Sequence, residues 1–598
     1  MSRHPKLTSL PVDKKTGLYH LETGDHRDFG YSDGSEDKLL KIILAATDRS
    51  SGSMELESSI TDWPTKYHLS NLRTNILRAL NFLKKDSQVL EVGAGCGGLT
   101  RFLGEHFKSV DAIEGSYKRA YITKERCKGL NNVRVYCSPL QEVTFDKEYD
   151  VVTLIGVLEY APIFYSPDDH PSDEACLAML KHAMTALKDD GCLIIAIENK
   201  FGLKYWSGCT EDHTGRLFDN IHGYPKGSRV ITFSRNEIKK LLQKVPLNHH
   251  EFYYPFPDYK LTNTILREVS NQATYYLHNW ITMPFEDYSH SRQYYFNEAL
   301  AIKSLVQAEM IYDFSNSFVV VASKKQSSFE KSMEPQWIAK RFSTNRILPF
   351  RTATVLERDE DSNSLVIRKR KLFEVKEPDA FIRLNPSDSK WIPGDLLLYS
   401  LCEALYKETM IEPLLNVFTT FHNELIRRYS LGKRDREGYP LVTSDAIDYI
   451  PCNIILNNEG LFSIDHEWLC IRPLSADYIL FRAVFLFASD QYPYIFRDSS
   501  MPSDMNTFIM SIMTSFYPQY DARRQALNKK LEEDFQSIVS GNPVKFPSFD
   551  EFGMVKDPIL QKEAQINAIL NSWSWKITSP LRWFYRKMRR NPRKGPSF

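Results

Sequence analysis

The chain has 598 residues, of which 42% are hydrophobic and 25% charged, and its formal net charge is +1. This length exceeds what one hydrophobic core supports, so we expect two or three domains, and the near-neutral charge gives no reason to expect a nucleic-acid partner. The nine cysteines include no C-x-x-C pair, which indicates reduced thiols and no zinc site.

The N-terminal segment, residues 1–65, is mostly polar and contains one apolar-periodic stretch, Leu39–Ala46. Residues 1–10 lack the apolar centre of a signal peptide, and no run of about 18 apolar residues is present in the chain. We therefore expect a cytoplasmic protein without a membrane span.

Residues 66–270 alternate between short apolar runs with the length of strands and longer runs with the periodicity of helices. The strand-like runs are Val89–Val92, Val110–Ile113, Val133–Cys137, Val151–Ile155, Cys192–Ile197 and Glu251–Tyr254. The helix-like runs include Tyr117–Cys127, Glu174–Leu187 and Arg235–Val245. This alternation predicts an α/β domain, in which a parallel sheet carries helices on both faces.

The first strand of this domain leads directly into a glycine-rich turn, residues 93–98, and then into a helix. Glycines there let backbone N–H groups and the helix N-terminus approach a cofactor without a clash from Cβ. Glu114 follows the second strand, where a carboxylate can accept hydrogen bonds from ribose hydroxyls. Because Gly93, Gly95 and Gly98 also fit the G-x-G-x-x-G fingerprint, a nicotinamide-dependent oxidoreductase is an alternative.

An acidic residue, Glu91, precedes the first glycine of the turn by two positions. With it, the turn resembles that of class I S-adenosylmethionine-dependent methyltransferases, in which the carboxylate helps to hold the amino acid end of the cofactor. Residues 149–160 and 187–195 resemble the fourth-strand and fifth-strand regions of the same family. The resemblance implies a Rossmann-like sheet over 66–270, with S-adenosylmethionine as cofactor. It implies the following cofactor-binding residues: Glu91, Gly93, Gly95, Gly97, Glu114 and Gly156, with Ser138 or Leu140 beside the adenine.

Residues that contact the methyl acceptor are expected at the ends of the fourth and fifth strands. We expect His213 to act as general base and Asp212 to orient it, although a solvated loop with a capping aspartate explains the same pair. Glu159, Lys200 and His222 are alternative residues for this part of the site.

Residues 271–335 are expected to form a helical connector, and residues 336–510 to begin with three strands and continue with helices. Asp448 and Asn453 then form a D-x-x-P-x-N motif, and Asp465 ends an apolar strand in an I-D-x-E motif. These motifs resemble those of small-molecule and aminoglycoside-type kinases. The resemblance implies an α+β kinase-like domain that binds ATP with Mg²⁺. Its residues would be Asp448 as catalytic carboxylate, Asn453 and Asp465 as metal ligands, and Lys369 on the phosphates.

Two features depart from the kinase pattern. Ala446 stands where that family usually has histidine, and residues 343–348, between the first two strands, contain no glycine. The alternative is an inactive module whose motif residues only hydrogen-bond loops, and which binds glycan or a partner glycosyltransferase.

The C-terminal part comprises a helical extension, residues 511–572, and a basic tail, residues 573–598. In the tail, apolar residues at positions 581, 584, 585 and 588 share one helical face, and arginines and lysines occupy the rest. A basic amphipathic helix flanked by tryptophans predicts binding to an anionic membrane surface, with docking onto the protein as the alternative.

The order of these parts resembles that of bacterial O-antigen methyltransferase–kinase proteins. The resemblance implies O-methylation of a sugar hydroxyl or sugar phosphate in a surface polysaccharide or its lipid-linked precursor, at the inner face of the cytoplasmic membrane. The long C-terminal coiled coil of that family is not expected here, because no sustained heptads follow residue 510.

Overall fold

The computed structural model describes residues 4–20, 32, 34–165, 173–269, 272–281, 283, 285–288, 292–326, 337–407, 411–495, 502 and 504–546. The predicted amphipathic tail, 573–598, lies outside these residues, as does the extension beyond residue 546. Among the helices that are described, none has the length and apolar composition needed to cross a membrane.

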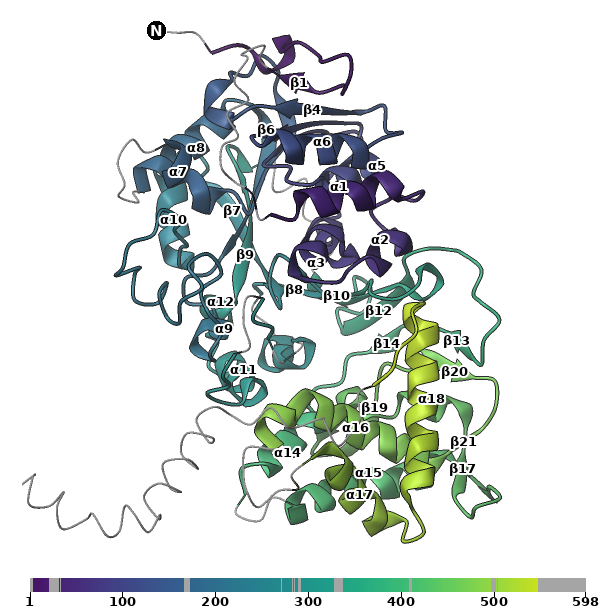
Figure 1. Cartoon of the computed structure of the whole chain (residues 1–598). Helices are drawn as coiled ribbons and strands as arrows, with labels where there is room; N and C mark the ends of the chain where they lie inside the picture. The colour runs from purple at the N-terminus through teal and green to yellow at the C-terminus, as the bar shows by residue number, and fades with distance from the viewer. Residues whose placement is uncertain are drawn as a thin grey trace, which may run out of the picture.

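One sheet runs through the molecule (Figure 1). Its first part has the order β4-β3-β2-β5-β6-β9-β7, with the short strand β1 (Tyr19–His20) at the outer edge. Neighbours from β4 to β6 are parallel, whereas β9 is antiparallel to both β6 and β7. The bounds are β2 Gln88–Val92, β3 Ser109–Glu114, β4 Val133–Cys137, β5 Tyr149–Ile155, β6 Leu187–Glu198, β7 His249–Phe256 and β9 Ser317–Ser323. This mostly parallel sheet confirms the α/β prediction.

Helices cover both faces of this part of the sheet (Figure 1). Their bounds are α1 Glu36–Ala45, α2 Met54–Ser58, α3 Trp63–Leu69, α4 Asn75–Arg78, α5 Gly98–His106, α6 Tyr117–Arg126, α7 Ala161–Tyr165, α8 Asp173–Met184, α9 Leu203–Trp206 and α10 Arg235–Gln243. Adjacent residues of β2 face opposite ways: Val89 shares a core with Phe102 of α5, and Leu90 with Met179 of α8. Both faces are therefore apolar and buried.

The N-terminal segment, expected to be polar, packs on the first part through α1. Leu39 and Ile43 of α1 contact a core that includes Ile122 of α6. Beside it, Arg119 Nε and Glu36 Oε1 form a buried ion pair at 3.0 Å. The charged residues of this segment therefore include at least one that is paired inside the protein.

The prediction of a purely helical connector over residues 271–335 is wrong. The segment contains the helices η5 (Gln272–Trp280), α11 (Glu298–Gln307) and α12 (Ile311–Phe314), but also the strand β9. Every residue of β9 is buried, and the strand is hydrogen-bonded to β6 on one side and β7 on the other. The first part of the chain therefore extends to Ser323, because its sheet is completed by this later strand.

The same sheet continues into the second half of the chain. β8 (Thr264–Arg267) pairs with β7 and with β10 (Trp337–Ser343), and antiparallel β11, β12 and β14 follow. Their bounds are β11 Thr352–Arg358, β12 Leu365–Lys371 and β14 Ser389–Lys390. The three strands predicted after residue 336 are thus confirmed as β10, β11 and β12. Hydrogen bonds between β8 and β10 join the two halves directly.

The second half is α+β, with helices packed beside small antiparallel sheets. Its elements are β13 Ile382–Leu384, β15 Asp395–Leu396, α14 Leu397–Ala404, α15 Ile411–Tyr429, β16 Ser430–Arg434, β17 Pro440–Val442, β18 Ile454–Asn457, β19 Gly460–Ser463, β20 Trp468–Cys470, β21 Leu474–Ser475, α16 Ala476–Ile495, α17 Met505–Phe516 and α18 Ala522–Ser540. A separate core joins α14, α15, α16 and α17, with Phe418, Phe487 and Phe508 among its buried residues.

Candidate active site

A cavity of about 380 Å³ lies at the carboxyl ends of the parallel strands. Glu91 lines it from β2, Glu114 from β3, Gly156 from the turn after β5, and Glu198 from the end of β6. In open α/β sheets, ligands bind at the carboxyl ends of the strands, at the point where the strand order reverses. The cavity therefore lies where the sequence predicted a cofactor.

The glycine turn has backbone angles that favour glycine. The φ angles of Gly93, Gly95 and Gly97 are +76°, +56° and +76°. A Cβ on Gly93 would lie 2.5 Å from Cγ2 of Val157, so this glycine allows the turn to pack closely. A Cβ on Gly95 would meet no protein atom within 4 Å, so Gly95 borders open space in the cavity. The turn thus leaves room for a ligand beside it.

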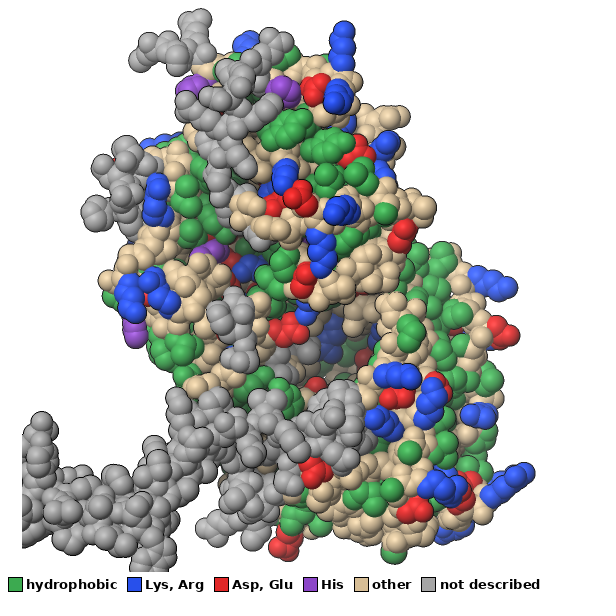
Figure 2. All heavy atoms as spheres, viewed as in Figure 1, with side chains coloured by type: hydrophobic (Ala, Val, Ile, Leu, Met, Phe, Trp, Pro, Cys, Tyr) green, Lys and Arg blue, Asp and Glu red, His purple; other side chains and the backbone are tan. Residues whose placement is uncertain are grey.

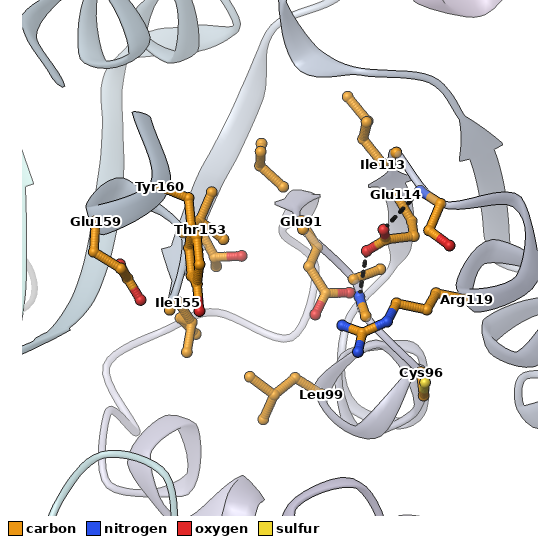
Figure 3. A pocket seen from close by; sticks show the side chains of 18 of the residues that line it. Glu91, Cys96, Leu99, Ile113, Glu114, Arg119, Thr153, Ile155, Glu159 and Tyr160 are labelled. Carbon is orange, nitrogen blue, oxygen red and sulfur yellow. Dashed lines mark hydrogen bonds between the residues drawn. The ribbon is translucent and has the colours of Figure 1, made fainter. Parts of the chain in front are cut away.

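Glu114 connects the second strand to the glycine turn. Its Oε2 accepts a hydrogen bond from the Gly95 N–H at 2.7 Å, and its Oε1 accepts one from the Ser116 N–H at 2.9 Å (Figure 3). Burial raises the pKa of this carboxyl, although the N–H donors and the nearby Arg119 oppose that effect. Each oxygen keeps a further lone pair, which a ribose hydroxyl can use.

Glu91 lies between Glu114 and Glu159 in the close view of the cavity (Figure 3). Its side chain is 4% exposed, and its Oε2 has no hydrogen-bond partner. Burial raises the pKa of Glu91 to about 8. A buried acceptor left unsatisfied is costly, so this oxygen fits the ammonium group of an amino acid that enters the cavity.

Ser138 and Leu140, the two candidates for the adenine end, both line the cavity just after β4. Both are buried, and the Ser138 N–H donates to the Glu114 carbonyl at 3.1 Å. The structure brings both residues together with Glu114 in one cavity.

His213 lines the same cavity, as predicted for the acceptor end. Its Nδ1 lies 3.3 Å from the hydroxyl of Tyr160, and its Nε2 lies 3.6 Å from Oε2 of Glu198. Burial lowers the pKa of the imidazole, but the Glu198 and Glu211 carboxylates outweigh burial and raise it to about 9.

Asp212 does not orient His213, and this prediction is wrong. The Asp212 Oδ2 instead accepts hydrogen bonds from Lys204 Nζ at 2.7 Å and from Lys260 Nζ at 3.0 Å. Burial raises the pKa of Asp212, and the two lysines outweigh it and hold the pKa at about 2. Asp212 and His213 are adjacent in this loop, but their side chains contact different groups. The carboxylate that faces His213 is that of Glu198.

Two buried glutamates, Glu159 and Glu198, lie at this end of the cavity. Glu159 is fully buried, and neither of its carboxylate oxygens has a hydrogen-bond partner. Burial, reinforced by the charge of Glu198, raises its pKa to about 8. Glu198 is also fully buried, and its Oε1 lies 2.6 Å from Lys260 Nζ and 3.1 Å from the Tyr259 hydroxyl. Lys260 and His213 outweigh burial and lower the pKa of Glu198 well below its ordinary value.

Of the alternative residues, only Glu159 belongs to this cavity. Lys200 pairs with Glu237 at 3.2 Å, and neither Lys200 nor His222 is among the residues that line the cavity. Sequence reasoning missed Lys260 and Tyr259, which carry no motif. Glu198 offered one signal, since it is the last residue of the fifth parallel strand.

The residues predicted for a kinase site also lie near one another. Lys369 on β12 forms ion pairs with Asp465 and, at 2.5 Å, with Oε2 of Glu467. Asp448 Oδ2 accepts the backbone N–H groups of Glu467 and Trp468, both at 2.7 Å. Its carboxylate therefore holds this turn in place.

Asn453 lies in the same loop cluster, where its Nδ2 donates to the Asp448 carbonyl at 3.1 Å. Burial is the main cause that raises the pKa of Asp448 to about 7. Asp448 and Asn453 thus make contacts that hold loops in place, and Lys369 forms an ion pair with Asp465.

Residues 66–251 match the family model described as a methyltransferase domain. A stretch of 81 residues is 37% identical to a protein of Papaver bracteatum named "Probable (S)-tetrahydroprotoberberine N-methyltransferase 2". Residues 66–251 form a methyltransferase domain. The stretch covers 13% of this chain and 23% of that relative, so the chain matches less than a quarter of the relative's length.

Solved structures of methyltransferases are also similar to the chain. Phosphoethanolamine N-methyltransferase 1 of Haemonchus contortus is 15% identical, with 50% of this chain and 52% of that chain covered and a TM-score of 0.27. Magnesium protoporphyrin IX methyltransferase of Synechocystis PCC 6803 is 13% identical, with 49% and 95% covered and a TM-score of 0.27.

The methyltransferase domain has a cavity whose charge suits one of the two predicted cofactors. Glu91 and Glu114 are buried carboxyls beside the glycine turn. Glu114 suits the ribose of either cofactor. A dinucleotide would place its anionic pyrophosphate near Glu91, which costs free energy, whereas S-adenosylmethionine would place an ammonium group there. The buried carboxyl groups of the cavity therefore fit S-adenosylmethionine and disfavour a nicotinamide dinucleotide.

Proposed function

We propose that this protein is an S-adenosylmethionine-dependent O-methyltransferase. Its acceptor would be a sugar hydroxyl or sugar phosphate of a bacterial surface polysaccharide or of its lipid-linked precursor. The observation that carries the methyl-donor half of this proposal is the buried, unpartnered Oε2 of Glu91 in the cavity of the methyltransferase domain.

The chemistry required of the domain is a direct displacement. An acceptor oxygen attacks the methyl carbon, the carbon–sulfur bond breaks, and its electron pair stays on sulfur, which becomes neutral. Glu91 would hold the amino acid end of the donor and Glu114 its ribose, and the surrounding apolar side chains exclude water. For a hydroxyl acceptor, the acceptor oxygen also loses a proton, which Nε2 of a neutral His213 imidazole would take up. Because the pKa of His213 is raised to about 9, this step would be faster at alkaline pH.

The acceptor half of the proposal is supported by the aromatic side chains of the cavity. Trp63, Tyr67 and Tyr160 line it together with His213. Flat aromatic faces can pack against the C–H face of a sugar ring, although such residues also fill cores. Further support for a saccharide acceptor comes from the order of the parts along the chain, which resembles that of bacterial O-antigen methyltransferase–kinase proteins.

Turnover with defined acceptors tests this proposal. We would measure S-adenosylhomocysteine formed from S-adenosylmethionine with saccharides that end in a hydroxyl or a phosphate, and with primary amines. The proposal predicts product with a saccharide and none with an amine. Loss of turnover in His213→Gln, with donor affinity kept and with Glu148→Gln as the exposed control, would support His213 as an acceptor-end residue. Methylation of amines alone would contradict the proposal.

A second candidate function, nucleotide binding by the second half, is favoured by the ion pair between Lys369 and Asp465. The pair joins the predicted phosphate-binding lysine to a predicted Mg²⁺ ligand. Figure 2 shows a hollow between the upper and lower halves of the molecule, with acidic and basic side chains inside it. A thermal shift with ATP and Mg²⁺ that disappears in Asp465→Ala would support kinase-like binding. No shift would favour an inactive module that binds glycan or a glycosyltransferase.

We also propose that the basic tail, residues 573–598, holds the protein at the inner face of the cytoplasmic membrane. The support is the sequence pattern alone: an apolar helical face, flanking tryptophans and a run of arginines and lysines. Co-sedimentation with anionic vesicles, compared between the full chain and a chain that ends at residue 572, tests it. Equal sedimentation of both would contradict it.

A further inference from the structure

Three side chains from separate segments converge at the acceptor end of the cavity. Glu159 comes from the short helix η4 (Leu158–Tyr160) that follows β5, Glu198 from the end of β6, and His213 from the loop that follows α9. One ligand atom from each lies within 4.8 Å of the others. All three residues line the same cavity.

The cluster leaves polar atoms without partners. Both oxygens of Glu159, Oε2 of Glu198 and Nε2 of His213 lack a hydrogen bond. Glu159 and Glu198 are fully buried and line the cavity, so the cluster faces the cavity and not the outer surface of the protein. Glu198 Oε2 and His213 Nε2 face each other at 3.6 Å, whereas both oxygens of Glu159 have no partner. Native proteins rarely leave such a buried group unsatisfied, so the cluster indicates a ligand that it is built to hold.

We propose that Glu159, Glu198 and His213 bind one divalent metal ion. Bonds of about 2.0–2.2 Å to a shared ion place ligand atoms roughly 3–4.5 Å apart. The 3.6 Å between His213 Nε2 and Glu198 Oε2 is within this range and is too long for a hydrogen bond. Two carboxylates also balance the charge of a divalent cation.

The mixed ligand set indicates the class of metal. Carboxylate oxygens suit Mg²⁺, Ca²⁺ and Mn²⁺, whereas imidazole suits the transition metals. One imidazole with two carboxylates therefore favours a borderline ion such as Mn²⁺, Fe²⁺ or Zn²⁺. Three protein ligands leave further coordination positions open, as in catalytic metal sites.

Neighbouring groups hold the ligands in place. The Tyr160 hydroxyl lies 3.3 Å from His213 Nδ1 and can accept its proton, which leaves Nε2 as the free ligand atom. Lys260 and Tyr259 contact Oε1 of Glu198 and leave Oε2 free. Ligands of protein metal sites are commonly oriented in this way.

The nearby lysines do not make the cluster cationic. Lys260 lies 2.6 Å from Glu198 and 3.0 Å from Asp212, and Lys204 lies 2.7 Å from Asp212 and 3.4 Å from Asp258. Each lysine therefore shares carboxylates outside the cluster. Glu159 remains a carboxyl group with no cationic partner in contact.

The ion would bind the methyl acceptor through the acceptor's oxygen, a role that rests on the proposed function. Hydroxyl and phosphate oxygens are suitable ligands for the open positions, and a metal-bound hydroxyl is more acidic than a free one. His213 would then be a metal ligand rather than the general base.

Manganese binding tests the site without any methyl acceptor. We would titrate the metal-free full-length protein with Mn²⁺ and follow the free-ion signal by electron paramagnetic resonance. The expected result is one bound ion, with affinity lowered about 100-fold in Glu159→Gln and in His213→Gln but kept in Glu174→Gln, an exposed glutamate of α8. Circular dichroism would report whether each variant folds.

The metal site can be tested on the wild-type protein alone, even if both variants fail to fold. Electron spin echo modulation of its bound Mn²⁺ should show coupling to the nitrogen of a single imidazole. Absence of Mn²⁺ binding at millimolar concentration, absence of nitrogen coupling, or equal affinity in wild type and folded Glu159→Gln would each overturn the metal site. Titration with S-adenosylhomocysteine is the separate readout: if it fails while Mn²⁺ binds, the proposed function is wrong and the metal site stands.

Discussion

The Oε2 of Glu114 accepts a hydrogen bond from the backbone N–H of Gly95 at 2.7 Å, which ties the end of β3 to the turn that follows β2. One carboxylate thus shapes the glycine turn and faces the cavity beside it. Glu91 presents a second, unpartnered carboxylate in the same cavity. Together these residues form the donor-binding half of the proposed methyltransferase site.

Replacement of Glu114 by alanine should weaken cofactor binding. Glu114→Ala removes both the contact to Gly95 and the expected contacts to ribose, so we expect affinity for S-adenosylmethionine to fall at least about 10-fold, or roughly 1.4 kcal/mol. Equilibrium dialysis with labelled S-adenosylmethionine measures this change. Glu148→Ala, an exposed residue before β5, serves as control, and equal affinity in both variants would remove Glu114 from the site.

A methyl group on Gly95 should abolish cofactor binding while it lowers the stability of the fold only slightly. Gly95→Ala and Gly129→Ala carry similar strain, because their φ angles are +56° and +89° and neither Cβ would meet an atom within 4 Å. Each should lower the free energy of unfolding by about 1 kcal/mol. Only Gly95→Ala places its methyl group in the cofactor cavity, so only this variant should lose S-adenosylhomocysteine binding in a thermal shift. A shift retained in Gly95→Ala would argue against the proposed pose.

Removal of the Asp212 carboxylate should destabilise the fold. Asp212→Asn leaves the buried Lys204 and Lys260 with less negative charge, so the free energy of unfolding in urea should fall by about 3–5 kcal/mol at pH 7. Asp361→Asn, at an exposed position, should have almost no effect.

The contribution of Asp212 to the free energy of unfolding should also depend on pH. The two lysines outweigh burial and hold its folded pKa at about 2, below the ordinary value of 3.8. The stabilisation is therefore present above pH 4 and is lost as the pH falls towards 2. The difference between wild type and Asp212→Asn should shrink over that interval. A difference that grows on acidification would contradict the ion pairs.

Asp448 should show the opposite dependence. Burial is the main cause that raises its folded pKa to about 7, above the ordinary value of 3.8. The folded state therefore binds the proton more tightly, and the free energy of unfolding should decrease by up to about 4 kcal/mol between pH 4 and pH 7 and then level off. Asp448→Asn has no carboxyl group to titrate here, so it should become more stable relative to wild type as the pH rises. Parallel pH profiles of the two proteins would contradict the burial of Asp448.

The donor end of the site could be predicted from the sequence because its residues are local. Glu91 stands two residues before Gly93, and Glu114 ends the next strand, so the spacing alone brings them to one edge of the sheet. The acceptor end could not be predicted in this way. The partner of His213 is Glu198, from another segment, and the adjacent Asp212 turns to buried lysines.

The boundaries of the fold were harder to predict than its class. The α/β alternation over residues 66–270 identified six strands of the first part. The seventh, β9, follows two helices in a segment that we predicted to be helical, and its place between β6 and β7 depends on contacts far apart in the chain. The β8–β10 pairing, which joins the two halves, likewise has no local signal.

Calorimetric titration of the purified full-length protein with S-adenosylhomocysteine and, separately, with NAD tests the central claim most directly. The account predicts one site for S-adenosylhomocysteine per chain and no heat of binding for NAD, because the buried carboxyl of Glu91 would lie near the pyrophosphate of the dinucleotide. Binding of NAD without binding of S-adenosylhomocysteine, or binding of neither, would contradict it.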